Sequence, residues 1–237
     1  MARHEPRFTL TTLEGLGTLV DEPPRVLAEG SSTTIAADLP VVRYNVAPGQ
    51  DAWVVRPGAG DGVPTRQLAK LRWGLLPRWQ GHGGKRPAMV HAAPLEAVAA
   101  TPLLRDAFKK QRCLVLADGC YAWNALKQPV WFHPEPVRVI ALAGVWATNK
   151  DDGVASFALL TGEPLVTRVS EPMPIVLDES CYDVWLSGAP DAAMSLCAPR
   201  ALDGWRADPV TTWMASADHD DPKCIEPVGN PRQGELF

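Results

Sequence analysis

Cysteine is scarce in this 237-residue chain and poorly placed for most cysteine chemistry. There are five cysteines, none before Cys113, and the sequence has neither a Cys-x2-Cys pair nor a histidine at zinc-ligand spacing. The pattern excludes common zinc motifs and predicts buried, reduced thiols. No apolar run approaches the roughly 20 residues that a membrane helix needs, and the first residues do not form a secretion signal. We therefore expect a cytoplasmic protein without a metal or another cofactor.

Acidic residues are absent from one long stretch. Between Gly62 and Leu95 there is no Asp or Glu, whereas six residues are positively charged, namely Arg66, Lys70, Arg72, Arg78, Lys85 and Arg86. Since the whole chain has a formal charge of −4 and this stretch +6, the rest carries −10. A basic face on an acidic body attracts an anionic partner. The alternative is that these side chains are scattered over a solvated surface.

Long linkers, repeats and low-complexity tracts are also absent. We expect one domain over residues 1–228 and a tail over residues 229–237. Short strands and short helices are mixed without a regular βαβ rhythm, which favours an α+β fold. Strands are expected over Arg7 to Leu13, Ala52 to Val55, Leu71 to Leu76, Val130 to His133, Val137 to Trp146 and Phe157 to Leu160, and helices over Pro94 to Phe108 (interrupted at Pro102), Asp183 to Ser187 and Ala189 to Cys197.

The stretch from Cys113 to Asn124 is the expected centre of the fold. Four consecutive apolar residues precede Asp118 and Gly119, and small, aromatic and polar residues follow. Because Gly tolerates positive φ and Asp bonds to nearby backbone, this pattern predicts a buried strand, a tight turn and a second strand returning beside it.

Nine tryptophans are many for this length, and Trp73 and Trp79 fall inside the basic stretch. Rings interleaved with Arg and Lys suit a single-stranded nucleic acid, because bases stack on rings while cations contact phosphates. A buried Trp with a bonded N–H is the alternative for either ring.

Seven blocks of the sequence, taken together, resemble a known family. They are Arg-Tyr-Asn-Val-Ala-Pro (43–48), Arg-Trp-Gly-Leu-Leu-Pro-x-Trp (72–79), Arg-Asp-Ala-Phe (105–108), Arg-Cys-Leu-Val-Leu-Ala-Asp-Gly-x-Tyr-x-Trp (112–123), Ala-Gly-x-Trp (143–146), Met-Pro-Ile-Val-Leu (173–177) and Cys-Ile-Glu-Pro-Val (224–228). Their order is similar to that in the SOS-response-associated peptidase (SRAP) family. The resemblance implies an α+β fold with a bifurcated mixed sheet, a barrel-like portion and surrounding short helices.

The resemblance also implies a role at abasic sites in single-stranded DNA during the DNA damage (SOS) response. In the family, an N-terminal cysteine exposed by Met removal attacks the open sugar aldehyde with its amine and thiol, and a thiazolidine crosslink closes. A Glu, a His and an Asn-Ala-Arg segment surround that chemistry.

This chain departs from the family pattern at those positions. Glu5 stands in place of the cysteine, Ala122 in place of the Glu and Ser170 in place of the His. The Asn and Arg positions fall on Ala92 and Pro94, or on His91 and Ala93 if one residue is gapped. Glu5 supplies neither the amine nor the thiolate of a thiazolidine, Ala122 cannot transfer a proton, and Ser170 does not titrate near neutral pH as the His would. We therefore expect a catalytically degenerate member, a pseudoenzyme, although whether any enzymatic activity survives stays open.

The family's DNA groove suggests which residues still bind. The corresponding positions here are Arg7, Asn45, Pro48, Trp73, Arg78, Trp79, Lys85 and Arg86. They predict non-covalent binding of single-stranded or abasic DNA.

Two alternatives remain. The chain ends Gln233-Gly234-Glu235-Leu236-Phe237, which resembles the peptide that docks on bacterial sliding clamps, with Gln233, Leu236 and Phe237 as the contacts. An apolar tail packed on its own domain is the competing explanation. Alternatively, if Met1 is removed before the small Ala2, the new α-amine could form a Schiff base with an abasic aldehyde, helped by Glu5 or His91.

Overall fold

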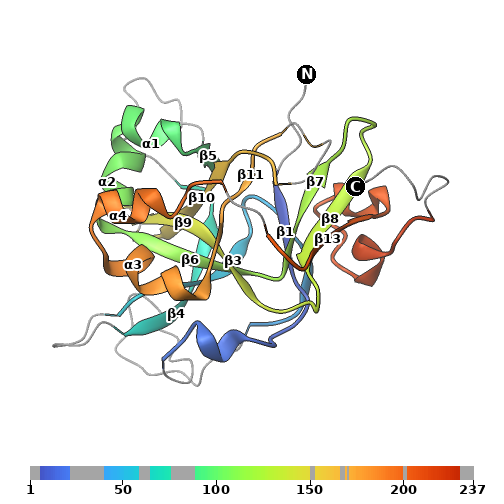
Figure 1. Cartoon of the computed structure of the whole chain (residues 1–237), viewed down its shortest axis with the longest axis horizontal. Coiled ribbons are helices and arrows are strands. Elements are labelled where there is room, and N and C mark those ends of the chain that lie inside the picture. Colours follow the sequence, from blue (N-terminus) through green and yellow to red (C-terminus); the bar gives the residue numbers. More distant parts are fainter. Residues whose placement is uncertain are drawn as a thin grey trace.

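Five strands close into a barrel in the computed structural model, which describes residues 6–21, 40–58, 65–75, 89–149, 153–165, 169, 171–199 and 202–229 (Figure 1). The strands of the barrel are β3 (Asp51–Pro57), β4 (Arg66–Trp73), β6 (Arg112–Ala117), β9 (Ile140–Thr148) and β10 (Ala155–Gly162). The order around the barrel is β10-β4-β3-β6-β9, and β9 pairs with β10 to close it. Within the barrel the β4–β10 pairing is parallel and the other four are antiparallel. Closure removes the free edges that an open sheet would leave.

A second, antiparallel sheet lies beside the barrel. Its order is β13 (Trp205–Pro209), β8 (Pro129–Pro134), β7 (Gly119–Trp123), β1 (Arg7–Leu10) and β2 (Arg43–Val46). The short strands β5 (Ala92–Pro94), β11 (Met173–Pro174) and β12 (Val176–Leu177) extend the barrel sheet. The predicted α+β class with a barrel-like portion is confirmed.

The predicted hairpin around Asp118 is wrong. β6 belongs to the barrel and β7 to the second sheet, so the chain changes sheets at Asp118 rather than turning back. The Asp118 carboxylate accepts hydrogen bonds from the backbone N–H groups of Thr11 and Thr12 and from the hydroxyls of Thr9 and Thr11. These four donors fix the junction, a role that local turn chemistry did not predict.

Gly119 is required at this junction for space rather than for positive φ. A Cβ on Gly119 would lie 2.3 Å from Nε1 of Trp131 on the neighbouring strand β8. That indole N–H in turn donates to the Thr9 hydroxyl at 3.0 Å. The close approach of β7 and β8 therefore depends on the missing side chain.

Short helices cover one side of the barrel, at the left of Figure 1. They are α1 (Glu96–Ala100), α2 (Pro102–Lys110), α3 (Tyr182–Ser187) and α4 (Pro190–Ser195). The predicted interruption at Pro102 is confirmed. Pro102 separates α1 from α2 and occupies the first turn of α2, where a backbone N–H would have no hydrogen-bond partner within the helix. Four 3-10 turns complete the secondary structure of the described residues, at Leu16–Thr18, Glu179–Cys181, Thr212–Ala215 and Pro222–Ile225.

Alternating side chains divide the apolar interior. On β3, Val55 belongs to the cluster under the helices, whereas Val54 belongs to the cluster that the barrel shares with the second sheet. Leu114 and Val115 of β6 divide in the same way. Because both faces of β6 are covered, all six of its residues are buried, which explains why its sequence is a continuous apolar run.

The strands predicted around Ala52, Val130, Val137 and Phe157 are confirmed within a few residues at their ends, and the one from Arg7 ends earlier, at Leu10. The apolar segment from Leu71 to Leu76 overlaps β4 only at residues 71–73, because that strand begins at Arg66. Residues 76–88 of the basic stretch and the tail after Gly229 lie outside the described residues. Among the helices of the described segments, none has the length and apolar character to cross a membrane.

Candidate functional site

The start of β1, the end of β7 and the segment before Met173 meet at one end of the second sheet. Arg7 of β1 pairs with Tyr121 of β7 in the antiparallel register. One residue further along β7 lies Ala122, and two residues beyond it Asn124 forms a bridge with Val169. The fold thus brings together three segments at which the family resemblance implied catalytic groups.

Aromatic packing connects this end of the sheet to the barrel. The ring centroid of Trp73 lies 4.9 Å from that of Phe8 on β1 and 6.1 Å from that of Phe157 on β10. The Trp73 indole N–H donates to the carbonyl oxygen of His91 at 2.8 Å. The same carbonyl accepts from the backbone N–H of Leu159 at 3.0 Å, so the entry to β5 is held against the barrel.

Apolar side chains occupy the centre of this arrangement. Phe8, Ala122 and Val169 are 1%, 6% and 6% exposed and belong to one contiguous cluster, and Ala92 of β5 packs at its edge. Ala93, in contrast, belongs to the other cluster, under the helices. The direct alignment, which places the family's Asn on Ala92, therefore puts that position against the cluster to which Ala122 belongs. None of these four side chains has a group that can donate or accept a proton.

Burial corrects the roles expected of Trp73 and Asn45. Trp73 is completely buried, so neither face of its ring is open to a base, and its N–H is already bonded. Asn45 is also completely buried, and its amide donates to the carbonyl oxygens of Met214, Ser216 and His219 at 2.7–2.9 Å. Both residues hold the scaffold together.

Arg7 and Pro48 are placed differently. Arg7 is 8% exposed, and its guanidinium donates to the Asn45 side-chain oxygen at 3.4 Å and to the Ala215 carbonyl oxygen at 3.1 Å. It therefore helps to seat the segment around Ala215 on β1 and β2. Pro48 is half-buried in the turn after β2.

The described cations of the acid-free stretch have acidic or aromatic neighbours. Arg66 forms an ion pair with Asp183 at 2.7 Å, and Arg72 forms one with Asp51 at 2.7 Å. Lys70 lies over the ring of Trp53, with its ammonium 5.8 Å from the ring centroid. The sequence run therefore overstates the free positive charge of β4.

Several predicted site residues lie outside the described residues. These are Arg78, Trp79, Lys85 and Arg86 of the basic stretch, Glu5 and Ser170 at family catalytic positions, and Gln233, Leu236 and Phe237 of the tail. Their assigned roles stay predictions.

The buried cysteines supply no reactive thiolate to the candidate site. Burial raises the pKa of the Cys120 thiol, on β7, to about 12. Burial likewise raises the pKa of Cys113 and Cys224, and that of Cys197 to about 11, where the Arg112 guanidinium opposes the shift. Because the thiolate is the nucleophile, these four cysteines are inert near neutral pH.

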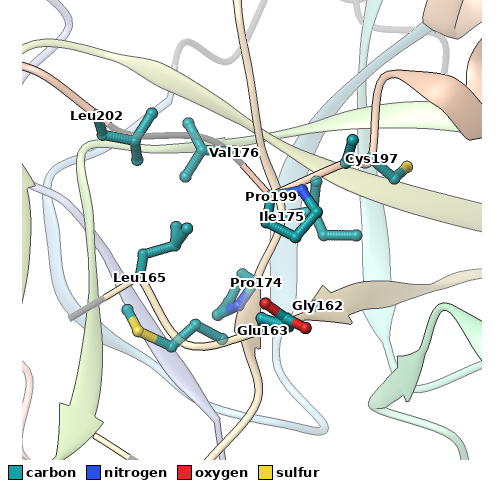
Figure 2. Close-up of a pocket in the computed structure, with 11 residues that line it drawn as sticks. Gly162, Glu163, Leu165, Pro174, Ile175, Val176, Cys197, Pro199 and Leu202 are labelled. Atoms are coloured by element: carbon teal, nitrogen blue, oxygen red, sulfur yellow. The ribbon is translucent and has the colours of Figure 1, made fainter. Parts of the chain in front are cut away.

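A small pocket lies between the β10–β11 connection and the chain that follows α4. Figure 2 shows Leu165, Val176 and Leu202 around one space, with Cys197 and Pro199 on the opposite side. Glu163 is the only carboxylate in the lining, and the buried thiol of Cys197 is protonated near neutral pH. The lining therefore has no acid/base pair and no activated nucleophile.

Sequence reasoning missed the tip of the β7–β8 hairpin. Leu126 there is 85% exposed and Lys127 has a positive φ of 59°. A signal was present in Asn124-Ala125-Leu126-Lys127 between two strand-like runs, since Asn commonly begins a turn by bonding to the backbone two residues on.

The fold defines a class: a closed five-stranded barrel joined to an antiparallel sheet, with an apolar cluster at the end where β1 begins. Comparison with known proteins gives the family. The model of the SOS response associated peptidase (SRAP) family matches residues 18–217, and the chain belongs to that family.

Related proteins agree with this assignment. The chain is 29% identical over 195 residues to abasic site processing protein YoqW of Bacillus subtilis, which covers 77% of this chain and 85% of that protein. It is 27% identical over 206 residues to abasic site processing protein HMCES of Gallus gallus, covering 71% of this chain and 60% of that protein.

Solved structures share the fold. A protein from Bordetella bronchiseptica superposes with a TM-score of 0.67 at 20% identity, covering 87% of this chain and 99% of that one. One from Bacteroides thetaiotaomicron superposes with a TM-score of 0.65 at 19% identity, covering 78% and 84%.

Proposed function

We propose that this protein binds single-stranded DNA, including strands with an abasic site, without forming a covalent bond to them. Its relatives are named for abasic site processing, and the chain shares their family over most of its length. A DNA damage role, in which the protein senses or shields unpaired strands, follows from that kinship.

One observation supports the loss of covalent chemistry. Ala122, at the family's Glu position, is buried in the same apolar cluster as Phe8 and Val169, and Ala92, at the Asn position in the direct alignment, packs against that cluster. A thiazolidine needs an amine and a thiol on adjacent carbons, and no cysteine precedes Cys113 in the sequence. Proton transfer at the sugar would need a titratable group where these alanines lie.

Binding of the strand is assigned to the basic stretch. Arg78 and Trp79, with Lys85 and Arg86, supply cations and a ring of the kind that phosphates and bases need. Trp73 and Asn45 contribute by fixing β4 and β2 rather than by touching DNA.

An electrophoretic shift with intact and abasic single strands tests the proposal. Run under native conditions, both strands should shift at micromolar protein, and under denaturing conditions neither should. A band that survives denaturation overturns the non-covalent mechanism. The absence of a native shift overturns DNA binding itself. Adding borohydride to a third set of lanes tests the Schiff base, since a trapped adduct would show a reactive amine.

Recruitment by the tail is a separate proposal from the sequence. Gln233, Leu236 and Phe237 would seat in an apolar pocket of a sliding clamp. A pull-down with purified clamp compares the full chain with one that ends at Pro231. Equal recovery of the clamp would discard the tail as a docking peptide.

A further inference from the structure

The tip of the β7–β8 hairpin is held rigidly by one side chain. The Asn124 side-chain oxygen accepts from the backbone N–H groups of Leu126 at 2.9 Å and Gln128 at 3.0 Å. The backbone of Asn124 bonds to Lys127 at 2.9 Å and to Gln128 at 3.0 Å. Four bonds across five residues leave the loop little freedom, so its side chains project in a fixed direction.

Lys127 occupies a conformation that its side chain disfavours. Its φ of 59° lies in the left-handed region, and it is the only non-glycine residue of the described segments with a positive φ. Gly or Asn is the usual residue at this place in a hairpin loop. Strain of this kind is concentrated at functional sites.

Leu126 is the most exposed large apolar side chain of the described residues, at 85%. The next residue, Lys127, is also exposed and carries a positive charge. A single leucine is too small to form a protein interface, which needs roughly 800 Å² from each partner. One apolar side chain is enough, however, to enter a step between two bases and unstack it.

The hairpin tip adjoins the candidate site. Asn124, which holds the loop, also bridges to Val169 of the apolar cluster, and Ala122 is two residues before it. Figure 1 shows the β7–β8 hairpin projecting at the end of the second sheet where β1 begins. A strand lying over the cluster would therefore pass beside Leu126.

We propose that Leu126 is a wedge that inserts between bases next to the DNA-binding site, with Lys127 pairing with an adjacent phosphate. This inference rests on the proposed function. The gap left by a missing base is the natural target, because unstacking costs least beside it. Asn124 acts as a positioning residue, since it fixes the loop that presents the wedge.

Fluorescence of 2-aminopurine placed beside an abasic residue in a single strand tests the wedge. Binding of the unaltered protein should raise the emission, because 2-aminopurine brightens when it is unstacked. Leu126→Ala should abolish the rise and weaken binding about tenfold. Asn124→Ala should reduce both the rise in emission and the affinity, although the leucine remains.

Lys127→Gly removes the cation and relieves the backbone strain. It should weaken binding, while the rise in emission is retained.

Val184→Ala is the matched control, because Val184 is another exposed apolar residue (39%) on α3, which lies away from the hairpin in Figure 1. It should behave as the unaltered protein. If the unaltered protein does not bind DNA, the proposed function fails and the wedge with it. If it binds and Leu126→Ala binds equally, only the wedge is overturned. Weakened binding with an unchanged emission signal also overturns the wedge, because the leucine would then contact something other than stacked bases.

Discussion

The hydroxyl of Thr9 donates a hydrogen bond to the carboxylate of Asp118, 109 residues away in the sequence, at the junction of the two sheets. The same hydroxyl accepts from the indole N–H of Trp131. β1, β8 and the corner between β6 and β7 are thus connected through one completely buried carboxylate. The position of the candidate site depends on this junction, because it fixes β1 against β7.

Asp118→Asn should lower the free energy of unfolding by roughly 3 kcal/mol. The amide would turn an NH2 group toward hydrogen-bond donors, and hydrogen bonds to a charged acceptor contribute about 1.5–3 kcal/mol each. Urea denaturation followed by tryptophan fluorescence measures the change. Asp106→Asn, on the exposed face of α2, is the control and should change stability little. A comparable effect of both substitutions would contradict the role of the junction.

Gly119→Ala should destabilise the fold by about 2–4 kcal/mol, since the new methyl group meets the Trp131 ring at 2.3 Å. Gly17→Ala serves as the comparison, because no atom lies within 4 Å of a Cβ at that position. The measurement is again urea denaturation. Combining Gly119→Ala with Trp131→Phe removes the Nε1 atom and should recover part of the loss. Without that recovery the clash would not be the cause.

Ala122→Glu should not restore covalent chemistry, and it should lower the free energy of unfolding. A carboxylate at a position that is 6% exposed among apolar side chains is expected to cost about 2–4 kcal/mol. The loss should grow as pH rises from 5 to 8, because burial raises the carboxyl pKa and ionisation then favours the unfolded chain. Ala125→Glu, at the exposed hairpin turn, is the matched variant and should show neither effect.

Stability should fall as pH rises above about 9. Burial raises the pKa of Cys120 to about 12 and of Cys197 to about 11, from an ordinary value of 9.0. Between pH 9 and 11 the unfolded chain therefore loses protons that the folded protein keeps, and each such thiol contributes up to about 1.4 kcal/mol per pH unit. Urea denaturation at pH 8, 9 and 10 gives the slope. Cys120→Ala should reduce that slope, and an unchanged slope would exclude this thiol as a source.

Affinity for single-stranded DNA should drop steeply between about 50 and 200 mM salt, since phosphate contacts release counterions. Arg78→Ala and Trp79→Ala should each weaken binding about tenfold while leaving thermal unfolding unchanged. Trp73→Ala provides the contrast: it removes a completely buried ring and should cost about 3–5 kcal/mol of stability. If the affinity did not depend on salt, or if neither Arg78→Ala nor Trp79→Ala weakened it, the assignment of DNA binding to the basic stretch would be disproved.

Local pattern was sufficient to predict several of the elements. The apolar run before Asp118 correctly predicted β6, because a strand covered on both faces needs no polar alternation. Pro102 correctly predicted two helices in place of one, since proline fits only the first turn. The family also followed from residues that stand in order along the chain.

Local sequence pattern could not predict which segments each element contacts in the fold. Asp118 and Gly119 look like a hairpin turn locally, yet their bonds and contacts are to Thr9 and Trp131, which only folding brings near. Trp73 is flanked in the sequence by Arg and Lys, as a ring that binds nucleic acid would be. In the fold, however, it packs against Phe8 and Phe157.

The amino-acid sequence alone thus determined the class of fold and the family, because each of these depends on residue identity and local periodicity. The tertiary structure decided that Trp73 and Asn45 are internal, that Ala122 is buried in an apolar cluster, and that Leu126 is exposed at the tip of the β7–β8 hairpin. The reason is physical: burial and strand pairing depend on contacts between distant segments, and short-range preferences do not specify those contacts.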